Sequence, residues 1–235
     1  MSPSNLEILA YEASPLGPLC LRRRELLSRP GTVVTEVTLN HEFLMSSLYT
    51  DSERVLAQTA LELHELESPS ADELRVLVGG LGLGYTAREA LRSDRVTEVE
   101  VVELLPQVID WLGRGLVPLS PELNEDARLT VAQGDIYGRL AEPAEKKFDL
   151  ILIDVDHSPD ERLGEESVAF YTTAGLRAAK EHLAENGVLA VWSYAESSPF
   201  ADALTEVFEK VRIEPVSYDN QLIDEQRTDW LFFGS

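Results

Sequence analysis

The segment Val76-Leu-Val-Gly-Gly-Leu-Gly-Leu-Gly-Tyr-Thr-Ala-Arg-Glu89 combines an apolar run, a glycine-rich turn and a helix-forming stretch. This order is typical of the strand, turn and helix that open a nucleotide-binding α/β unit. The glycines stand at alternate positions, Gly80-x-Gly82-x-Gly84, where they permit a tight turn and clear side chains from a ligand's path to the main chain. Because glycine clusters also mark ordinary loops, the rest of the chain must decide between the two interpretations.

Downstream of this segment, short apolar runs alternate with helical patterns, which predicts a mainly parallel sheet with helices on both faces. The last two expected strands lack a helix between them and should form an antiparallel hairpin. The predicted fold is therefore a Rossmann-like α/β fold with a mostly parallel seven-stranded sheet. The expected strands are 75–78, 98–103, 128–132, 148–154, 188–194, 211–217 and 229–233; the expected helices are about 84–91, 106–113, 167–185 (ended by Asn186-Gly187) and 199–210.

The first 50 residues read differently, as short β-type pieces broken by proline and glycine. We expect a small β-rich extension of two or three strands that packs on the rest of the chain, with residues 40–47 as a loop or short turn. Next come a helix over residues 51–66 and a joint at 68–72. The predicted division is an N-terminal extension with its linking helix, 1–70, and a nucleoside-binding transferase domain, 71–235.

The amino-acid composition indicates which kinds of partner the chain favours and in which compartment it is expected. The chain has 42 acidic and 20 basic residues, a formal net charge of −22, which disfavours nucleic acid and anionic membranes and favours cationic substrates. Acidity that serves solubility alone is the other interpretation. The single cysteine, Cys20, excludes an intramolecular disulfide and a cysteine zinc cluster. With no signal-peptide pattern and no long apolar run, we expect a cytoplasmic protein that does not enter a membrane.

Three acids fall at the ends of expected strands, where open parallel sheets bind ligands. Glu103 is placed to accept the ribose hydroxyls, Asp135 to accept an adenine amine, and Asp154 to lie beside the glycine turn. The site should bind an adenine nucleoside. There is no Gly-Lys-Ser/Thr of a P-loop, and the glycine spacing differs from the dinucleotide pattern. The pattern resembles a class I S-adenosylmethionine-dependent transferase.

More specifically, several motifs resemble those of the polyamine aminopropyltransferase (spermidine synthase-like) family. They are Gly80-Leu-Gly-Leu-Gly-Tyr-Thr-Ala-Arg-Glu89, Val101-Val-Glu103, Gly134-Asp135, Phe148-Asp-Leu-Ile-Leu-Ile-Asp154, Ala169-Phe-Tyr171, Glu185-Asn-Gly-Val-Leu189 and Trp230-Leu-Phe-Phe-Gly-Ser235. The resemblance implies that decarboxylated S-adenosylmethionine, or S-adenosylmethionine itself, is the donor, with no metal. The implied donor-binding residues are Gly80, Gly82, Gly84, Glu103, Leu104, Gly134, Asp135, Ile136 and Asp154. Because related enzymes are dimers or tetramers, the extension could support a homodimer.

The chain departs from this family at two places that bear on the reaction. Leu83 stands where the family carries an aspartate for the donor's amino group, and the family's Asp-Ser-Ser/Thr-Asp-Pro is here Asp154-Val-Asp-His-Ser-Pro159. We find no match near 45–60 to the family's substrate-gating Gln and Tyr–His segment. Asp154 is the expected base, and Asp156 is expected to hold a cationic amine acceptor. Residues 156–166 carry five acids and form either an acidic lid or a solvated loop.

Three functions stay open at this level. The first is aminopropyl transfer to a polyamine-type amine, the second is methyl transfer on the same scaffold, and the third is non-catalytic nucleoside binding. Trp192 and Tyr194 either line an acceptor pocket or fill the core, and His157 is either a second base or a loop residue. Ser46-Ser47 is placed where it could face the end of the donor.

Overall fold

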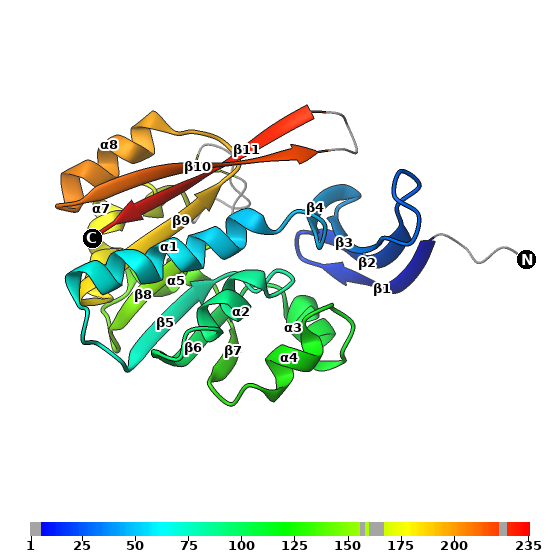
Figure 1. Ribbon diagram of the computed structural model, residues 1–235, viewed down its shortest axis with the longest axis horizontal. Helices are drawn as coiled ribbons and strands as arrows, with labels where there is room; N and C mark the ends of the chain where they lie inside the picture. The colour runs from blue at the N-terminus through cyan, green and yellow to red at the C-terminus, as the bar shows by residue number, and fades with distance from the viewer. Residues whose placement is uncertain (1–5, 156–157, 160–166, 221–224) are drawn as a thin grey trace, which may run out of the picture.

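The computed structural model describes residues 6–155, 158–159, 167–220 and 225–235, and these form a small and a large β-sheet (Figure 1). The small sheet is antiparallel, in the order β1-β2-β3-β4. It contains four strands where the sequence predicted two or three. Its strands are β1 (Leu6–Ser14), β2 (Gly17–Glu25), β3 (Val33–Leu39) and β4 (Glu42–Ser46).

The prediction of a loop over residues 40–47 was wrong, because β4 occupies most of that segment. The hairpin between β3 and β4 turns on Asn40 and His41, which have φ angles of 50° and 70°. Two consecutive residues with positive φ give the twist that a tight hairpin needs. Asn-His lacks the glycine that usually signals such a turn, so the turn and the strand after it were missed.

The large sheet has seven strands in the order β10-β11-β9-β8-β5-β6-β7. Strands β5 to β9 are parallel to one another, and the β10–β11 hairpin joins antiparallel to β9, as the sequence predicted. The strands are β5 (Leu74–Gly79), β6 (Val96–Glu103), β7 (Leu129–Gln133), β8 (Phe148–Ile153), β9 (Leu183–Ser193), β10 (Val211–Asn220) and β11 (Glu225–Gly234).

Helices cover both faces of the large sheet, and side chains that alternate along its strands define two cores. Val76 and Val78 belong to the core beneath the first four helices, whereas Leu77 belongs to the core beneath α5, α7 and α8. The helices are α1 (Asp51–Glu67), α2 (Tyr85–Leu91), α3 (Pro106–Gly113), α4 (Ser120–Glu125), α5 (Ile136–Ala141), α6 (Ser167–Phe170), α7 (Thr173–Glu181) and α8 (Ser198–Val207). Among the described residues, no helix combines the length and the apolar composition needed to cross a membrane.

The single helix expected over 167–185 is two helices, α6 and α7. The break comes at Thr172, whose hydroxyl accepts a hydrogen bond from the Gly175 N–H and so caps a new helix. The chain is tightly folded there, since a Cβ on Gly175 would lie 2.0 Å from the Ala169 carbonyl oxygen. Asn186, with φ 60°, lies within β9 and does not cap the helix. The short helices α4 and α5 were not expected.

The small sheet is anchored to the helices beside the large one. The indole Nε1 of Trp111 donates to Glu12 Oε1 over 3.0 Å, Gln107 donates to the Ala13 carbonyl, and Arg23 donates to the Leu116 carbonyl. Leu19 and Leu21 of β2 are fully buried in the same core as β5. The cores of the two sheets are therefore continuous.

Helix α1 comes directly after the small sheet in the chain and packs on α2, β8 and β9 of the large sheet (Figure 1). Its first turn consequently lies where the two sheets meet. The predicted division of the chain at residue 70 stays a prediction. It groups α1 with the N-terminal extension, whereas in the structure α1 packs on α2, β8 and β9.

Candidate active site

The glycine turn lies at the carboxyl end of β5, between β6 and β8, where the connections leave the sheet in opposite directions. Gly80 has φ 92°, and a Cβ there would lie 2.3 Å from the Asp154 carbonyl oxygen. Only glycine therefore lets the turn pass the end of β8. Gly84, with φ 94°, precedes α2, and its own Cβ would meet Leu123 at 2.4 Å. Both glycines are required by the fold itself.

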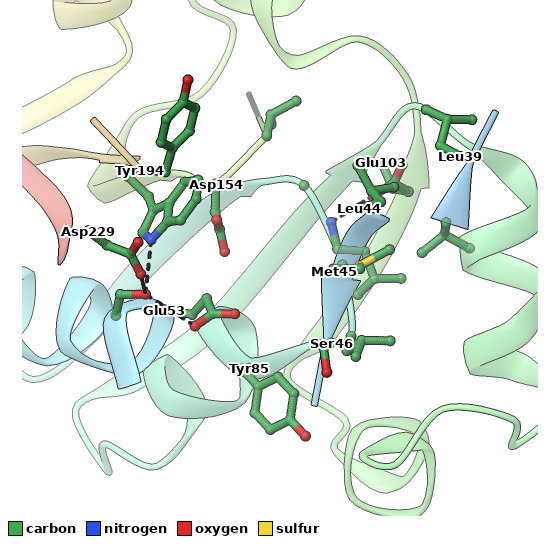
Figure 2. Close-up of a pocket in the computed structure, with 18 of the residues that line it drawn as sticks. Leu39, Leu44, Met45, Ser46, Glu53, Tyr85, Glu103, Asp154, Tyr194 and Asp229 are labelled. Carbon is green, nitrogen blue, oxygen red and sulfur yellow. Dashed lines mark hydrogen bonds between the residues drawn. The ribbon is translucent and has the colours of Figure 1, made fainter. Parts of the chain in front are cut away.

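A cavity of about 1130 Å³ opens over this turn, between the large sheet and the small one. Gly80 and Gly82 line its floor, but Gly84 is not among the lining residues. Leu44, Met45 and Ser46 of β4 form the opposite wall (Figure 2). The space above Gly82 is open, because the nearest atom to a Cβ there would be Met45 Sδ at 3.5 Å. A ligand in this cavity can approach the main chain at Gly82.

Glu103 ends β6 and lines the cavity beside Leu104. Its Oε2 accepts the Leu81 N–H and its Oε1 the Leu105 N–H, each over 2.8 Å. Burial raises the pKa of this carboxyl, and the backbone N–H donors partly oppose that rise. The N–H groups of Gly82 and Leu104 also act on this carboxylate, so Glu103 holds the glycine turn from a position on the cavity wall.

Gly134, Asp135 and Ile136 come after β7, and all three line the cavity. Asp135 is the N-cap of α5, because its side chain accepts from the Tyr137 and Gly138 N–H groups. This cap explains why a helix begins where the sequence pattern predicted none. Asp135 also lines the cavity, and its contact with an adenine amine stays a prediction.

Asp154 comes after β8 at the other side of the turn. Its Oδ2 accepts a hydrogen bond of 2.8 Å from the Thr86 hydroxyl on α2. Burial raises the pKa of Asp154 to about 6, although the Thr86 bond acts in the opposite direction. Asp154 therefore lies in the cavity as an oriented carboxyl group that can change its protonation state near neutral pH.

Two further acids, Glu53 and Asp229, join Asp154 in the cavity, and sequence reasoning missed both. Figure 2 shows these three carboxyl groups on one side of the cavity, with Glu103 at the other end. Burial, reinforced by Asp154, raises the pKa of Glu53 to about 8, and burial also raises that of Asp229. One signal could have found Asp229, namely an acid directly before the apolar run Trp230-Leu-Phe-Phe233 of the last strand. Glu53 resembles any acid in the first turn of a helix.

Asp229 is held by a short chain of hydrogen bonds from two other elements. The Ser52 hydroxyl of α1 donates to Asp229 Oδ2 over 2.6 Å, and the Trp192 indole of β9 donates to the same Ser52 oxygen over 3.0 Å. Trp192 and Tyr194 both line the cavity. The sequence left open whether these two side chains line a pocket or fill the core, and in the structure both form part of the cavity wall.

Some of the remaining predicted site residues lie within the described part of the chain, and others lie outside it. Leu83 is buried, only 4% exposed, and lines the cavity. Ser46 lines it too, whereas Ser47 accepts the Thr35 N–H. Asp156 and His157 lie outside the described residues, as do all five acids of the expected lid. In the ranges that the structure covers, no cluster of three or more His, Cys, Asp or Glu side chains is arranged to hold a metal ion.

The mostly parallel seven-stranded sheet, its closing antiparallel hairpin and the cavity at the carboxyl ends of the strands define a class I methyltransferase-like fold. Solved spermidine synthases share it. The enzyme from Thermotoga maritima matches with a TM-score of 0.74 and 18% identity, over 97% of this chain and 72% of that one. A spermidine synthase in complex with the transition state analogue AdoDATO matches with a TM-score of 0.74 and 20% identity, over 97% and 73%.

A family model described as the spermine/spermidine synthase domain matches residues 52–210, more than half of the chain. The chain belongs to the spermine/spermidine synthase family. A polyamine aminopropyltransferase from Prochlorococcus marinus (strain MIT 9312) is 26% identical over 136 residues, 58% of this chain and 46% of that protein. One from Ruegeria sp. (strain TM1040) is 35% identical over 115 residues, 49% and 38%. The chain spans less than half the length of these curated relatives.

Proposed function

We propose that the chain binds decarboxylated S-adenosylmethionine and transfers its aminopropyl group to a polyamine-type amine. The observation that carries the proposal is the position of Asp154, an oriented and buried carboxyl group in the same cavity as the glycine turn and Glu103. Membership of the spermine/spermidine synthase family and the names of the curated relatives support it. The compartment that fits this function is the cytoplasm.

The reaction needs little covalent help from the protein. The neutral nitrogen of the acceptor attacks the aminopropyl carbon next to the sulfonium sulfur, and a carbon–nitrogen bond forms as the carbon–sulfur bond breaks. The electron pair of that bond neutralises sulfur, and methylthioadenosine leaves. The protein's main task is to hold the two reactants in line. The glycine turn and Glu103 would hold the donor, and the walls contributed by β4 and β9 would confine the acceptor.

Asp154 would take the proton that the attacking amine loses. A base works best when its pKa lies near the working pH, and burial raises the pKa of Asp154 to about 6. Above that pH the group is mostly ionised and ready to accept. Thr86 keeps one carboxyl oxygen engaged, so the other is the oxygen available to the acceptor.

The acceptor in this proposal is a small cationic amine. Glu53 and Asp229 lie on the Asp154 side of the cavity, where negative charge on Asp229 would attract a second ammonium group. The assigned role of Asp156, which lies outside the described residues, stays a prediction. Nucleic acid is not an expected partner of so acidic a chain, and the N-terminal extension could support a homodimer.

Methyl transfer from S-adenosylmethionine is the second candidate, and Leu83 is the observation that favours it. Leu83 lines the cavity with an apolar side chain at the position where the resembling enzymes carry an aspartate for the donor's amine. Without that carboxylate, the preference for an aminopropyl donor has to come from other groups.

Calorimetry separates the two candidates. We expect decarboxylated S-adenosylmethionine and methylthioadenosine to bind more tightly than S-adenosylmethionine and S-adenosylhomocysteine. The opposite order would favour methyl transfer. Turnover is then measured with the preferred donor and a series of diamines, such as putrescine. No turnover with any diamine contradicts aminopropyl transfer. No measurable activity with either donor, in the wild-type chain and in Asp154→Asn alike, would favour a non-catalytic nucleoside-binding protein.

A further inference from the structure

Ser52 connects three parts of the chain that are far apart in sequence. It lies in the first turn of α1, is only 4% exposed, and contacts Trp192 of β9 and Asp229 of β11. Ser52 and Asp229 are 177 residues apart. A buried serine with two polar partners is a fixed group, because any rotation of its hydroxyl would leave a partner unsatisfied.

The direction of the hydrogen bonds is set by the chemistry of the three groups. An indole N–H can only donate, so the Trp192 bond occupies a lone pair on the Ser52 oxygen. The single Ser52 proton is then free for a carboxylate. Asp229 Oδ2 is 2.6 Å away and Glu53 Oε2 is 3.4 Å away, so Asp229 receives the proton and Glu53 does not.

This direction has a consequence for charge in the cavity. A hydrogen bond that donates to a carboxylate favours its ionised form and fixes its orientation. Asp229 has this donor, and the Trp192 side chain acts on it in the same direction, whereas the Ser52 hydroxyl makes only a long contact to Glu53. Negative charge is therefore easier to keep on Asp229 than on Glu53. The groups that face these two carboxyls are Ser52 of α1, Tyr85 of α2, Asp154 after β8, Trp192 of β9 and Tyr218 of β10.

We propose that Ser52 is a positioning residue that keeps Asp229 ionised and oriented, so that Asp229 receives the acceptor's non-reacting cationic group. The inference rests on the proposed function, since it assigns the part of the cavity that recognises the acceptor. Trp192 completes the chain by holding the Ser52 oxygen. Asp154 would still accept the proton of the attacking amine. Glu53 is the carboxyl of the three that most readily holds a proton.

The test compares Ser52→Ala with Ser120→Ala in the full chain. Ser120 is a matched control because it too is buried, and its hydroxyl has no hydrogen-bond partner among the described residues. We expect Ser52→Ala to raise the KM for putrescine about tenfold, the order expected for losing one hydrogen bond to a charged group. The turnover number and the donor affinity should stay near their wild-type values, and Ser120→Ala should leave all three unchanged.

Two further readouts separate positioning from a general structural role. In Ser52→Ala, the rising limb of kcat/KM for putrescine should move to higher pH, because the Asp229 carboxylate has lost a stabilising donor. In a double-mutant cycle, Asp229→Asn and Ser52→Ala should be strongly non-additive, since both act on the same charge. Additive effects, or equal losses of donor and acceptor binding, overturn the proposal.

The inference can be judged even if aminopropyl transfer fails. Carbon-detected NMR titration of the aspartate carboxyls reports the pKa of Asp229 without any reaction, and it should rise in Ser52→Ala but not in Ser120→Ala. Calorimetric binding of putrescine to the donor-free chain gives a second measure. An Asp229 titration that is the same in both variants overturns the inference, whereas an inactive wild-type chain contradicts only the proposed function.

Discussion

At the scale of residues, the cavity is defined by carboxyl groups that burial has brought together. Glu53, Asp154 and Asp229 come from a helix start, a strand end and a closing strand. Burial is the largest cause of the raised pKa at each of them, and neighbouring negative charge adds to it at Glu53 and Asp154. Such groups cost folding free energy when ionised, and that cost is typical of functional sites.

Asp154→Asn tests the base at this scale. The amide has nearly the same shape but cannot take a proton, so we expect the turnover number to fall by about 10²- to 10⁴-fold, the usual contribution of a positioned base. Donor affinity, measured by calorimetry, should change little. Wild-type turnover in this variant would exclude Asp154 as the base.

Glu53→Gln tests the cost of the buried charge. Because the folded-state pKa of Glu53 is raised from 4.5 to about 8, the folded chain holds a proton that the unfolded chain has released. Wild-type stability is therefore penalised increasingly as pH rises from about 4.5 to about 8. We expect Glu53→Gln to melt several degrees above wild type at pH 8, since about 1 kcal/mol moves the midpoint of a chain of this size by 2–4 °C.

The matched control is Glu62→Gln, on an exposed position of the same helix. This substitution removes one negative charge that is exposed to water and therefore carries no cost of burial. The melting temperature of Glu62→Gln should follow that of wild type across the pH range. The gain in Glu53→Gln should shrink toward pH 4.5. A gain that does not depend on pH would mean that packing and not charge is responsible.

At the scale of elements, the glycine turn performs two separate tasks. Gly80 and Gly84 face protein atoms, and their positive φ angles and close contacts are required for the fold. Gly82 also has positive φ, 53°, but faces open space up to Met45. One motif therefore contains two glycines that the chain needs and one that leaves room for a ligand.

Alanine substitution distinguishes these tasks. Gly80→Ala should destabilise the fold by several kcal/mol, because it combines a strained φ angle, which costs about 1–3 kcal/mol, with a clash against backbone. Gly82→Ala should fold with about 1 kcal/mol of strain but weaken donor binding by tenfold or more. Urea unfolding and donor calorimetry measure the two effects. Gly113→Ala is the control, because nothing lies within 4 Å of its Cβ position.

If Gly82→Ala binds the donor as wild type does, the donor does not approach the main chain at this turn. The predicted roles of Gly80, Gly82 and Gly84 would then reduce to folding.

At the scale of the whole molecule, the cavity exists because the small sheet packs over the carboxyl ends of the large one. The Glu12–Trp111 hydrogen bond, together with the apolar contacts of Leu19 and Leu21, holds the two sheets together. Leu44, Met45 and Ser46, which form one wall, belong to the small sheet. Docking of the sheets and donor binding should therefore be coupled.

Glu12→Ala tests this coupling. Trp111 is fully buried, and loss of its acceptor should cost about 1–3 kcal/mol, the penalty for an unsatisfied buried donor. We expect lower stability in urea and weaker donor binding together. Glu7→Ala, at an exposed position of the same strand, should change neither. Loss of stability with unchanged donor affinity would show that the sheet–sheet contact does not shape the cavity.

The elements of the large sheet were predictable from sequence because each strand and its turn are encoded locally. The apolar run of β8, the glycines after β5 and the missing helix between β10 and β11 each carry their own signal. Glu103, Asp135 and Asp154 could be named because parallel strands place their carboxyl ends at one edge. The two misread regions, 40–47 and 167–185, depend on the φ angles of Asn40 and His41 and on a cap at Thr172.

The fold class, the glycine turn and the acids at the strand ends could be read from the amino-acid order alone, because hydrophobic period and turn chemistry are local properties. It took the folded chain to bring Ser52 and Glu53 at the start of α1 beside Asp229 near the end of the chain. Contacts between residues so far apart depend on the order of the strands and on how the small sheet docks. The acceptor side of the cavity is therefore a product of tertiary packing, whereas the glycine turn on its donor side is a product of local sequence.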